Sequence, residues 1–166
     1  MILVTGLASV CMLRVTAQQT TALCSSQYNW MENIKNQSPC LVAAYLQSVC
    51  SSGSYTVQSL GPSMQYTGPW LGQANDCECN TPTYCLLSAC SICQNATYVS
   101  WSSWSFNCST IYNEYPGSIP NGTAIPEWAY QDVLTTDDFD VTIAQGPEGE
   151  LVSDYALGTL TSLQTT

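Results

Sequence analysis

Apolar residues recur at helical spacing in the stretch that follows Ser38. Ser38 is suited to cap a helix, Pro39 fits a first helical turn, and Gly53 lies beyond the end as a stop signal. The apolar positions are three or four residues apart, so a helix would gather them on one broad face. They are Leu41, Val42, Tyr45, Leu46 and Val49. We therefore expect a helix that packs against the core through this face.

A second helix is predicted to begin near Asn80 or Thr81, with Pro82 just inside it. Apolar residues and cysteines follow at spacings of three and four, which places them on one side of the helix. They are Leu86, Ala89, Cys90 and Cys93. The two cysteines should therefore point inward together.

Shorter helices are predicted in three further places. Ser100 can cap a turn that contains two tryptophans, and residues 28–34 can form another short helix. The segment 125–130 carries a proline suited to a first turn, and Trp128 would anchor it onto the core.

Alternating apolar and polar runs typical of strands are scarce, and residues 51–76, with two Gly-Pro pairs, indicate a long loop. The predicted fold class is mainly α: a small disulfide-stapled helical domain with long loops and a disordered C-terminal tail. We divide the chain into a signal peptide at 1–17, a cysteine-rich helical domain at 18–134, and a flexible acidic tail rich in Ser and Thr at 135–166.

The composition places the chain in an oxidising compartment. Its 166 residues include ten cysteines and no histidine, with 12 acidic and two basic residues and a net charge of −10. Cysteines at this density persist as disulfides outside the cell, so we expect a secreted or extracellular protein. Without an imidazole, nucleophilic triads in their ordinary form are excluded. We therefore expect a protein that is not an enzyme and uses no cofactor.

The N-terminus has the pattern of a signal peptide. An almost uncharged apolar run, Met1–Leu13, is followed by Val15-Thr16-Ala17, which offers small residues where signal peptidase cleaves. Removing 1–17 leaves one basic residue, Lys35, against twelve acidic ones, a net charge of −11. Such a surface repels nucleic acid and anionic lipid, so we expect neither as a partner. No second long apolar stretch predicts a membrane span.

The cysteines are compatible with two kinds of site. Cys77-x-Cys79 and Cys90-x-x-Cys93 have the spacing of a four-thiolate zinc site, but thiols of secreted proteins are usually oxidised, so disulfides are favoured over metal. Nine cysteines follow the signal peptide, and we predict that Cys85 is the free thiol, because it lies toward the edge of the inward face of its helix. The other eight would form four disulfides, whose connectivity the spacing does not select. They are Cys24, Cys40, Cys50, Cys77, Cys79, Cys90, Cys93 and Cys108.

Two acidic residues flank Cys77. Asp76 and Glu78 could be the carboxylate pair of a glycosidase, a chemistry that needs no histidine. Catalytic carboxylates usually come from distant segments, however, and most acids of this chain lie in predicted loops. Solvated charge is therefore the preferred interpretation, and no catalytic residue is assigned.

Five tryptophans and ten tyrosines can either fill the limited core of a small domain or line a sugar-binding face. A glycan-binding module, with cell-wall glycans as partners, is therefore an alternative. Four sequons fit N-glycosylation, and Asn95 and Asn121 are the better candidates. The sequon of Asn36 is followed by proline, and that of Asn107 contains a cysteine.

Five short motifs occur together in this chain. They are SPCLVAAYL from Ser38, YTGP from Tyr66, CECN from Cys77, SACSICQ from Ser88 and SWSSWS from Ser100. In combination they resemble a family of uncharacterised extracellular proteins of mushroom-forming fungi, over about residues 24–143. Members typically carry the same eight cysteines and a serine-like residue in place of Cys85, which also implies that Cys85 is the spare. The family has no established activity, so we expect a secreted or cell-surface, wall-associated glycoprotein.

A second resemblance, to the fungal CFEM domains, is partial. It is based on the spacing of the later cysteines, which are Cys77, Cys79, Cys90, Cys93 and Cys108. CFEM domains are helical, and some bind haem through an aspartate that precedes the Cys-x-Cys motif. The resemblance implies an alternative function in haem or iron binding, with Asp76 as the ligand.

Overall fold

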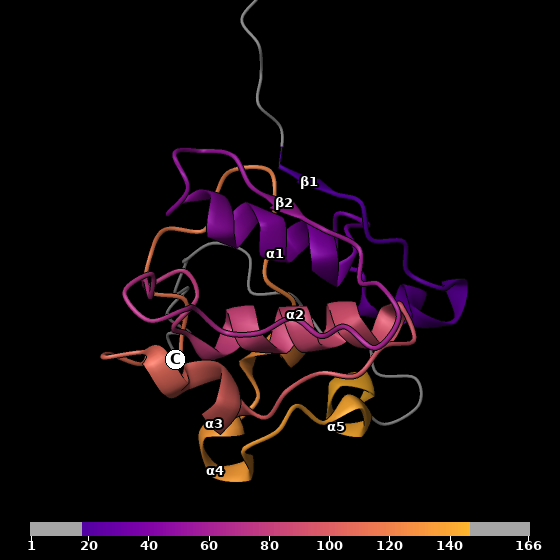
Figure 1. Cartoon of the computed structure of the whole chain (residues 1–166). Coiled ribbons are helices and arrows are strands. Elements are labelled where there is room, and N and C mark those ends of the chain that lie inside the picture. Colours follow the sequence, from indigo (N-terminus) through magenta and orange to yellow (C-terminus); the bar gives the residue numbers. More distant parts are fainter. Residues whose placement is uncertain (1–17, 147–166) are drawn as a thin grey trace, which may run out of the picture.

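The computed structural model describes residues 18–146 (Figure 1). The predicted signal peptide at 1–17, which includes Cys11, and residues 147–166 lie outside the described residues. Within 18–146, helix covers 38% and strand 5%. The chain is thus a small domain with several helices and four disulfides, although its helical share is modest because long loops connect the elements. None of the helices in this range has the length and apolar character that a membrane crossing requires.

Helices α1 (Pro39–Ser48) and α2 (Thr81–Cys93) pack against each other at the centre of the domain (Figure 1). Both begin as predicted. Ser38 Oγ accepts a hydrogen bond from the backbone N–H of Leu41 at 3.3 Å, and Asn80 Oδ1 accepts one from that of Thr83 at 2.8 Å. A cap of this kind stabilises a helix by about 1 kcal/mol. The N-terminal ends of both helices therefore follow from local sequence.

The buried side of α1 differs from the predicted one. Val42 and Leu46 are buried, but Leu41 is half-buried and Val49, beyond the end of the helix, is 50% exposed. Ala43 and Ala44 are fully buried instead. The reason is that α1 contacts α2 on one side and the strands on another, so small side chains are needed where these elements approach it closely.

Helix α2 is buried on every side. All residues from Thr81 to Ser91 are buried, including polar ones such as Ser91, whose hydroxyl donates to the Leu87 carbonyl at 3.1 Å. The residues predicted to face inward are therefore buried, but so are residues on the other sides of the helix. Cys85 is fully buried rather than placed at the edge of a face, and it is the one cysteine of the described residues outside a disulfide.

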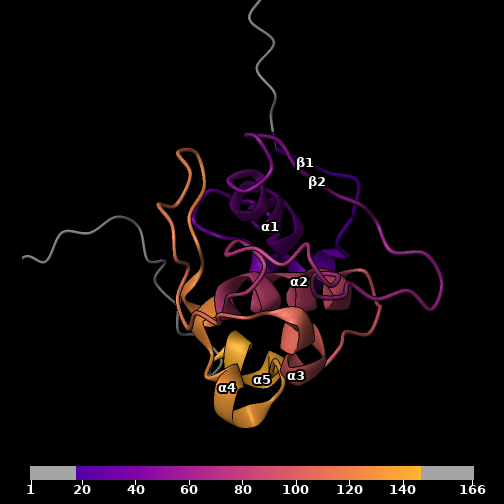
Figure 2. The same ribbon diagram turned by 60° about the vertical axis from the view of Figure 1, so that its left-hand side comes forward.

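Short elements cover both sides of the α1–α2 pair (Figures 1 and 2). Strands β1 (Gln19–Thr20) and β2 (Thr56–Val57) pair in parallel against α1, so the predicted loop at 51–76 contains a short strand. The helix predicted at 28–34 is the 3-10 helix η1 (Ser26–Met31). The remaining elements are α3 (Trp101–Trp104), η2 (Ser105–Asn107), η3 (Glu127–Tyr130), α4 (Val133–Thr136) and α5 (Val141–Gln145).

Four disulfides connect these elements, and they use the eight cysteines predicted to pair. They are Cys24–Cys93, Cys40–Cys90, Cys50–Cys77 and Cys79–Cys108. The paired residues are 27 to 69 positions apart, so each disulfide closes a long loop of the unfolded chain. A disulfide of this kind stabilises a fold by about 2–4 kcal/mol. Four disulfides in a small domain are typical of extracellular proteins.

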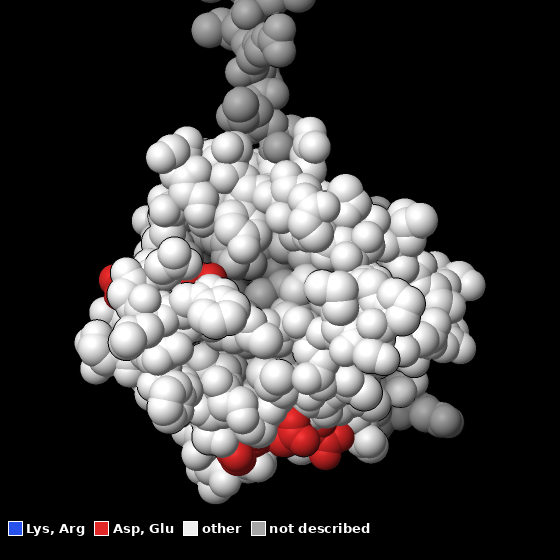
Figure 3. All heavy atoms as spheres, in the orientation of Figure 1, with Lys and Arg blue, Asp and Glu red and all other residues white. Residues whose placement is uncertain are grey.

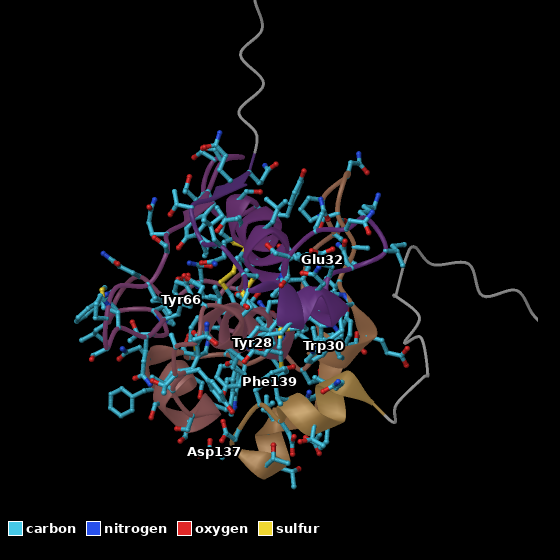
Figure 4. The ribbon with its side chains drawn as sticks, turned by 90° about the vertical axis from the view of Figure 1, so that its right-hand side faces the viewer. Tyr28, Trp30, Glu32, Tyr66, Asp137 and Phe139 are labelled. Carbon is cyan, nitrogen blue, oxygen red and sulfur yellow. A yellow bond between two sulfur atoms is a disulfide. The ribbon has the colours of Figure 1, made fainter. Side chains whose placement is uncertain are left out.

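The packed domain extends beyond the predicted boundary at residue 134. Phe139 is 1% exposed, and its ring makes edge contacts with Trp128 and Tyr98. Figure 4 shows Phe139 above the α4–α5 segment, toward the interior, and Asp137 at the outer edge. Ala144 in α5 is also fully buried. The prediction of a flexible tail from residue 135 is therefore wrong for 135–146, because buried apolar side chains and hydrogen bonds, such as that from the Tyr98 hydroxyl to the Phe139 carbonyl at 2.7 Å, attach this segment to the core.

Replacing Phe139 with alanine should destabilise the domain by about 3–5 kcal/mol, since it removes a buried aromatic ring and leaves a cavity. Chemical denaturation of the secreted protein measures the loss. Leu134→Ala, at a position 49% exposed in α4, is the matched control and should change stability by less than about 0.5 kcal/mol. Equal effects of the two variants would place Phe139 outside the cooperative core.

Cys85 should resist alkylation in the native protein and react once the protein unfolds without reductant. Burial raises the pKa of its thiol, and only the thiolate is nucleophilic. Mass spectrometry after iodoacetamide treatment should show no adduct on the native chain from residue 18 and one adduct in guanidinium. More than one adduct before reduction would contradict the four disulfides.

Candidate binding site

Helix α3 forms one wall of a surface groove. Ser100 Oγ accepts a hydrogen bond from the backbone N–H of Ser103 at 3.3 Å, which confirms the predicted cap. Trp101 and Trp104, three positions apart, point inward, and their rings meet the edge of the Tyr84 ring at centroid distances of 5.4 and 5.9 Å. Of the two roles considered for the tryptophans, these two therefore fill the core. The residues between them, including Ser102, therefore face outward.

The opposite wall is the loop around Gly68, which lies directly against the end of α3. A Cβ atom at Gly68 would lie 1.8 Å from the backbone oxygen of Trp104, so only glycine permits this approach. Asn107 holds the next residue, because its Nδ2 donates to the Pro69 carbonyl at 2.9 Å. On the N-terminal side of Gly68, Gln65 Nε2 donates to Thr97 Oγ1 at 2.7 Å. The loop is thus attached on both sides of its contact with α3.

The outer groove, as we name it, lies between these two walls and has a volume of about 590 Å³. Two large aromatic side chains in its lining are unusually exposed to solvent: Trp70 is 76% exposed and Phe106 is 83% exposed. Its remaining surface consists of hydroxyl, amide and backbone groups, and no charged side chain lines it. The lining residues are Thr67, Gly68, Pro69, Trp70, Ser102, Ser103, Phe106 and Asn107.

A smaller cavity, the inner pocket, has a volume of about 200 Å³. Thr67 lines both cavities, so the loop that carries it separates them. Three aromatic residues, one carboxylate and two glutamines contribute to the lining of the inner pocket. The complete lining is Gln47, Tyr55, Thr56, Val57, Gln58, Tyr66, Thr67, Glu78, Leu87 and Trp104.

Glu78 is the acidic residue of the inner pocket. Burial raises the pKa of its carboxyl, and a hydrogen bond from Asn75 Nδ2 to Oε2 at 2.7 Å opposes part of that effect. The backbone oxygen of Glu78 accepts a hydrogen bond from Trp104 Nε1 at 2.9 Å, which fixes the acidic residue beside the indole. Burial, followed by the charge of Glu78, also raises the pKa of Tyr55.

Asp76, the ligand implied for haem, does not line either cavity. Its side chain is exposed, and its backbone oxygen accepts a hydrogen bond from Asn80 Nδ2 at 2.8 Å. Asp76 and Glu78 therefore have different environments, one in solvent and one in a pocket. The structure does not present the two as a matched carboxylate pair.

The cysteines considered for zinc are all in disulfides with other residues. Cys77 pairs with Cys50, Cys79 with Cys108, and Cys90 and Cys93 with partners outside α2. The Sγ atoms of Cys24, Cys40 and Cys93 lie within 4.8 Å of one another, but all three belong to two adjacent disulfides. Oxidised sulfurs are not thiolate ligands, so this arrangement offers a covalent crosslink rather than a metal centre.

The four predicted glycosylation sites have different surroundings. Asn36, Asn95 and Asn121 are exposed. Asn107 is half-buried and uses the Nδ2 atom, to which a glycan would be attached, in its bond to Pro69. Its place in the groove wall therefore fits a structural role better than a glycan acceptor.

Sequence reasoning considered the tryptophans and tyrosines together and singled out neither Trp70 nor Phe106, because local sequence does not decide which aromatic side chains stay exposed. A usable signal was present at Trp70, since it lies with Leu71 between Gly68-Pro69 and Gly72, in a stretch that resembles neither helix nor strand. Large apolar residues in such a loop are candidates for an exposed contact surface.

No family model, curated protein or solved structure matches the chain. The interpretation of both cavities is therefore based on their own chemistry.

Gly68→Ala should disrupt the outer groove, because the added methyl group cannot occupy the position of the Trp104 oxygen without moving the loop. We expect a loss of about 1–3 kcal/mol in the free energy of unfolding. Gly117→Ala is the control, since its Cβ would meet only the Tyr115 side chain, at 3.4 Å or more, and it should be nearly neutral. An unchanged stability and an unchanged Trp70 fluorescence in the Gly68 variant would refute the close contact.

Proposed function

We propose that this protein is a secreted, non-enzymatic glycoprotein whose outer groove binds a neutral glycan, such as a cell-wall polysaccharide. The observation that carries the proposal is the pair of exposed aromatic side chains, Trp70 and Phe106, at a groove lined by hydroxyl and amide groups. Exposed aromatic residues of this kind mark contact surfaces. Cell-wall association, as the resemblance to the fungal family implies, belongs to the same proposal.

The chemistry of the groove favours sugar over other ligands. Aromatic rings can stack on the apolar face of a sugar ring, while Ser102, Ser103 and Asn107 offer hydrogen-bonding groups around its edge. No charged side chain lines the groove itself, and the nearby Asp137 carboxylate is occupied by hydrogen bonds from Ser102, so the lining favours a neutral ligand. The net charge of −10 disfavours acidic polysaccharides, because like charges repel at a distance.

Two other functions receive less support. A haem site would need its oxygen ligand to face an apolar cavity, whereas the Asp76 side chain is exposed and lines neither cavity. A glycosidase would need two carboxylates across a substrate cleft, and the outer groove has none in its lining. A binding role is therefore the proposal that the described residues support best.

Trp70→Ala and Phe106→Ala should each weaken glycan binding by about tenfold, because stacking of one aromatic ring contributes up to about 1.5 kcal/mol. Calorimetry against neutral oligosaccharides of glucan, mannan and chitin type measures the effect. Leu23→Ala removes an apolar side chain that is 87% exposed away from the groove lining, and it should leave the affinity unchanged.

The glycan proposal fails if no neutral oligosaccharide binds the wild-type protein. It also fails if Leu23→Ala weakens binding as much as the two groove variants, since binding would then reflect general surface hydrophobicity.

A further inference from the structure

We propose that the inner pocket is a second binding site, specific for an organic ammonium group. It combines a half-buried carboxylate, Glu78, with the aromatic residues Tyr55, Tyr66 and Trp104. Aromatic residues around a cation, supported by a carboxylate, are the usual way in which proteins bind amines and quaternary ammonium groups. This proposal is based on the inner pocket alone and does not depend on the glycan proposal.

The carboxylate of Glu78 lacks a cationic partner among the described residues. Two neutral side chains interact with it: Asn75 donates one hydrogen bond to Oε2, and Tyr55 lies close enough for the charge to affect its pKa. Lys35 is the only basic residue in 18–146, and it does not line the pocket. A partly desolvated carboxylate without a counter-ion is stabilised by any cation that can reach it.

The aromatic residues make the pocket suitable for an organic cation rather than a strongly hydrated metal ion. Trp104 is fixed by its hydrogen bond to the Glu78 carbonyl, and Tyr66 by donating from its hydroxyl to the Gln58 carbonyl at 2.6 Å. Trp104 and Tyr66 are thus held in place before a ligand arrives. Cation–π attraction to such rings is worth about 0.5–2 kcal/mol and favours weakly hydrated cations.

The size of the inner pocket indicates a head group rather than a whole ligand. Its volume of about 200 Å³ is below the roughly 300–1,000 Å³ typical of sites that enclose a drug-sized molecule. A trimethylammonium group or the amine-bearing part of one sugar ring is of suitable size. The rest of the ligand would extend outward past Thr67, the residue shared with the outer groove.

The surrounding charge favours the approach of a cation. Figure 3 shows acidic side chains at the left edge, left of centre and at the bottom of the view, and no basic side chain among the described residues on the face drawn there. A chain with 12 acidic and two basic residues attracts cations from solution and raises their concentration at the surface. This field adds to the local effect of Glu78.

The test uses the secreted protein and choline, with 3,3-dimethylbutan-1-ol as an uncharged molecule of the same shape. Calorimetry should show one choline bound per chain and at least about tenfold weaker binding of the alcohol. Glu78→Gln should weaken choline binding by about tenfold, since it keeps the size of the side chain and removes its charge.

Asp76→Asn is the matched control, because it removes the same charge two residues away from an exposed side chain that does not line the pocket. It should leave choline affinity nearly unchanged. Trp70→Ala should also leave it unchanged, which separates this site from the outer groove. Near-ultraviolet circular dichroism and the count of free thiols verify that each variant is folded.

The pH dependence provides an independent readout. Tyr55 and Tyr66 are the other titratable groups in the lining, and burial raises the pKa of both, so they stay neutral. Choline keeps its charge at every pH, so its binding should weaken only as Glu78 takes up a proton when the pH falls. Because burial raises the pKa of Glu78, the loss should begin at a higher pH than for an exposed glutamate. Glu78→Gln should abolish this dependence.

Glucosamine, compared with glucose, identifies the source of the ammonium group. Tighter binding of choline would assign a quaternary head group, and tighter binding of glucosamine would assign an amino sugar; both outcomes support the site. The proposal is overturned if neither amine binds, if the neutral alcohol binds as well as choline, or if Asp76→Asn weakens binding as much as Glu78→Gln.

Discussion

The covalent attachment of α2 is the constraint on which the rest of this structure depends. Cys90 and Cys93 connect α2 to α1 and to the N-terminal segment, through disulfides that span 50 and 69 residues of sequence. A chain with modest helical content and long loops would otherwise lose much conformational entropy on folding for a small core. Because the disulfides restrict the unfolded chain, α2 can be enclosed on all sides by short elements that would not be stable alone.

Aromatic side chains complete the core where regular structure is short. Tyr84 on α2 contacts both inward tryptophans of α3, and its hydroxyl donates to the Val99 carbonyl at 2.9 Å. On another side, Phe139 and Trp128 join the α4–α5 segment and η3 to the centre. A larger domain would hold such segments with a second layer of long helices. Here, contacts between large aromatic rings hold segments of only four or five residues in place.

The short elements and long loops also form the two cavities. The loop between β2 and α2 rests on α3 through Gly68 and exposes Trp70 beside the outer groove. Glu78 lies between Cys77 and Cys79, which are fixed by two disulfides, so its backbone is held by covalent bonds while Asn75 orients its carboxylate. A rigid frame that presents polar and aromatic groups from loops is typical of binding proteins.

Local chemistry determined much of this protein. The helix caps at Ser38, Asn80 and Ser100, the pairing of eight cysteines, and the small helical domain could be predicted, because caps depend on neighbouring residues and oxidation depends on compartment. Local chemistry could not select the disulfide partners, the enclosure of Cys85, or the attachment of 135–146, since these depend on which distant segments meet. Trp70 and Trp104 are the same residue type, yet Trp70 is 76% exposed and Trp104 is buried at 3% exposed. Only the tertiary structure decides between these two environments. The physical reason is that burial is a property of the surrounding contacts, which no single stretch of sequence contains.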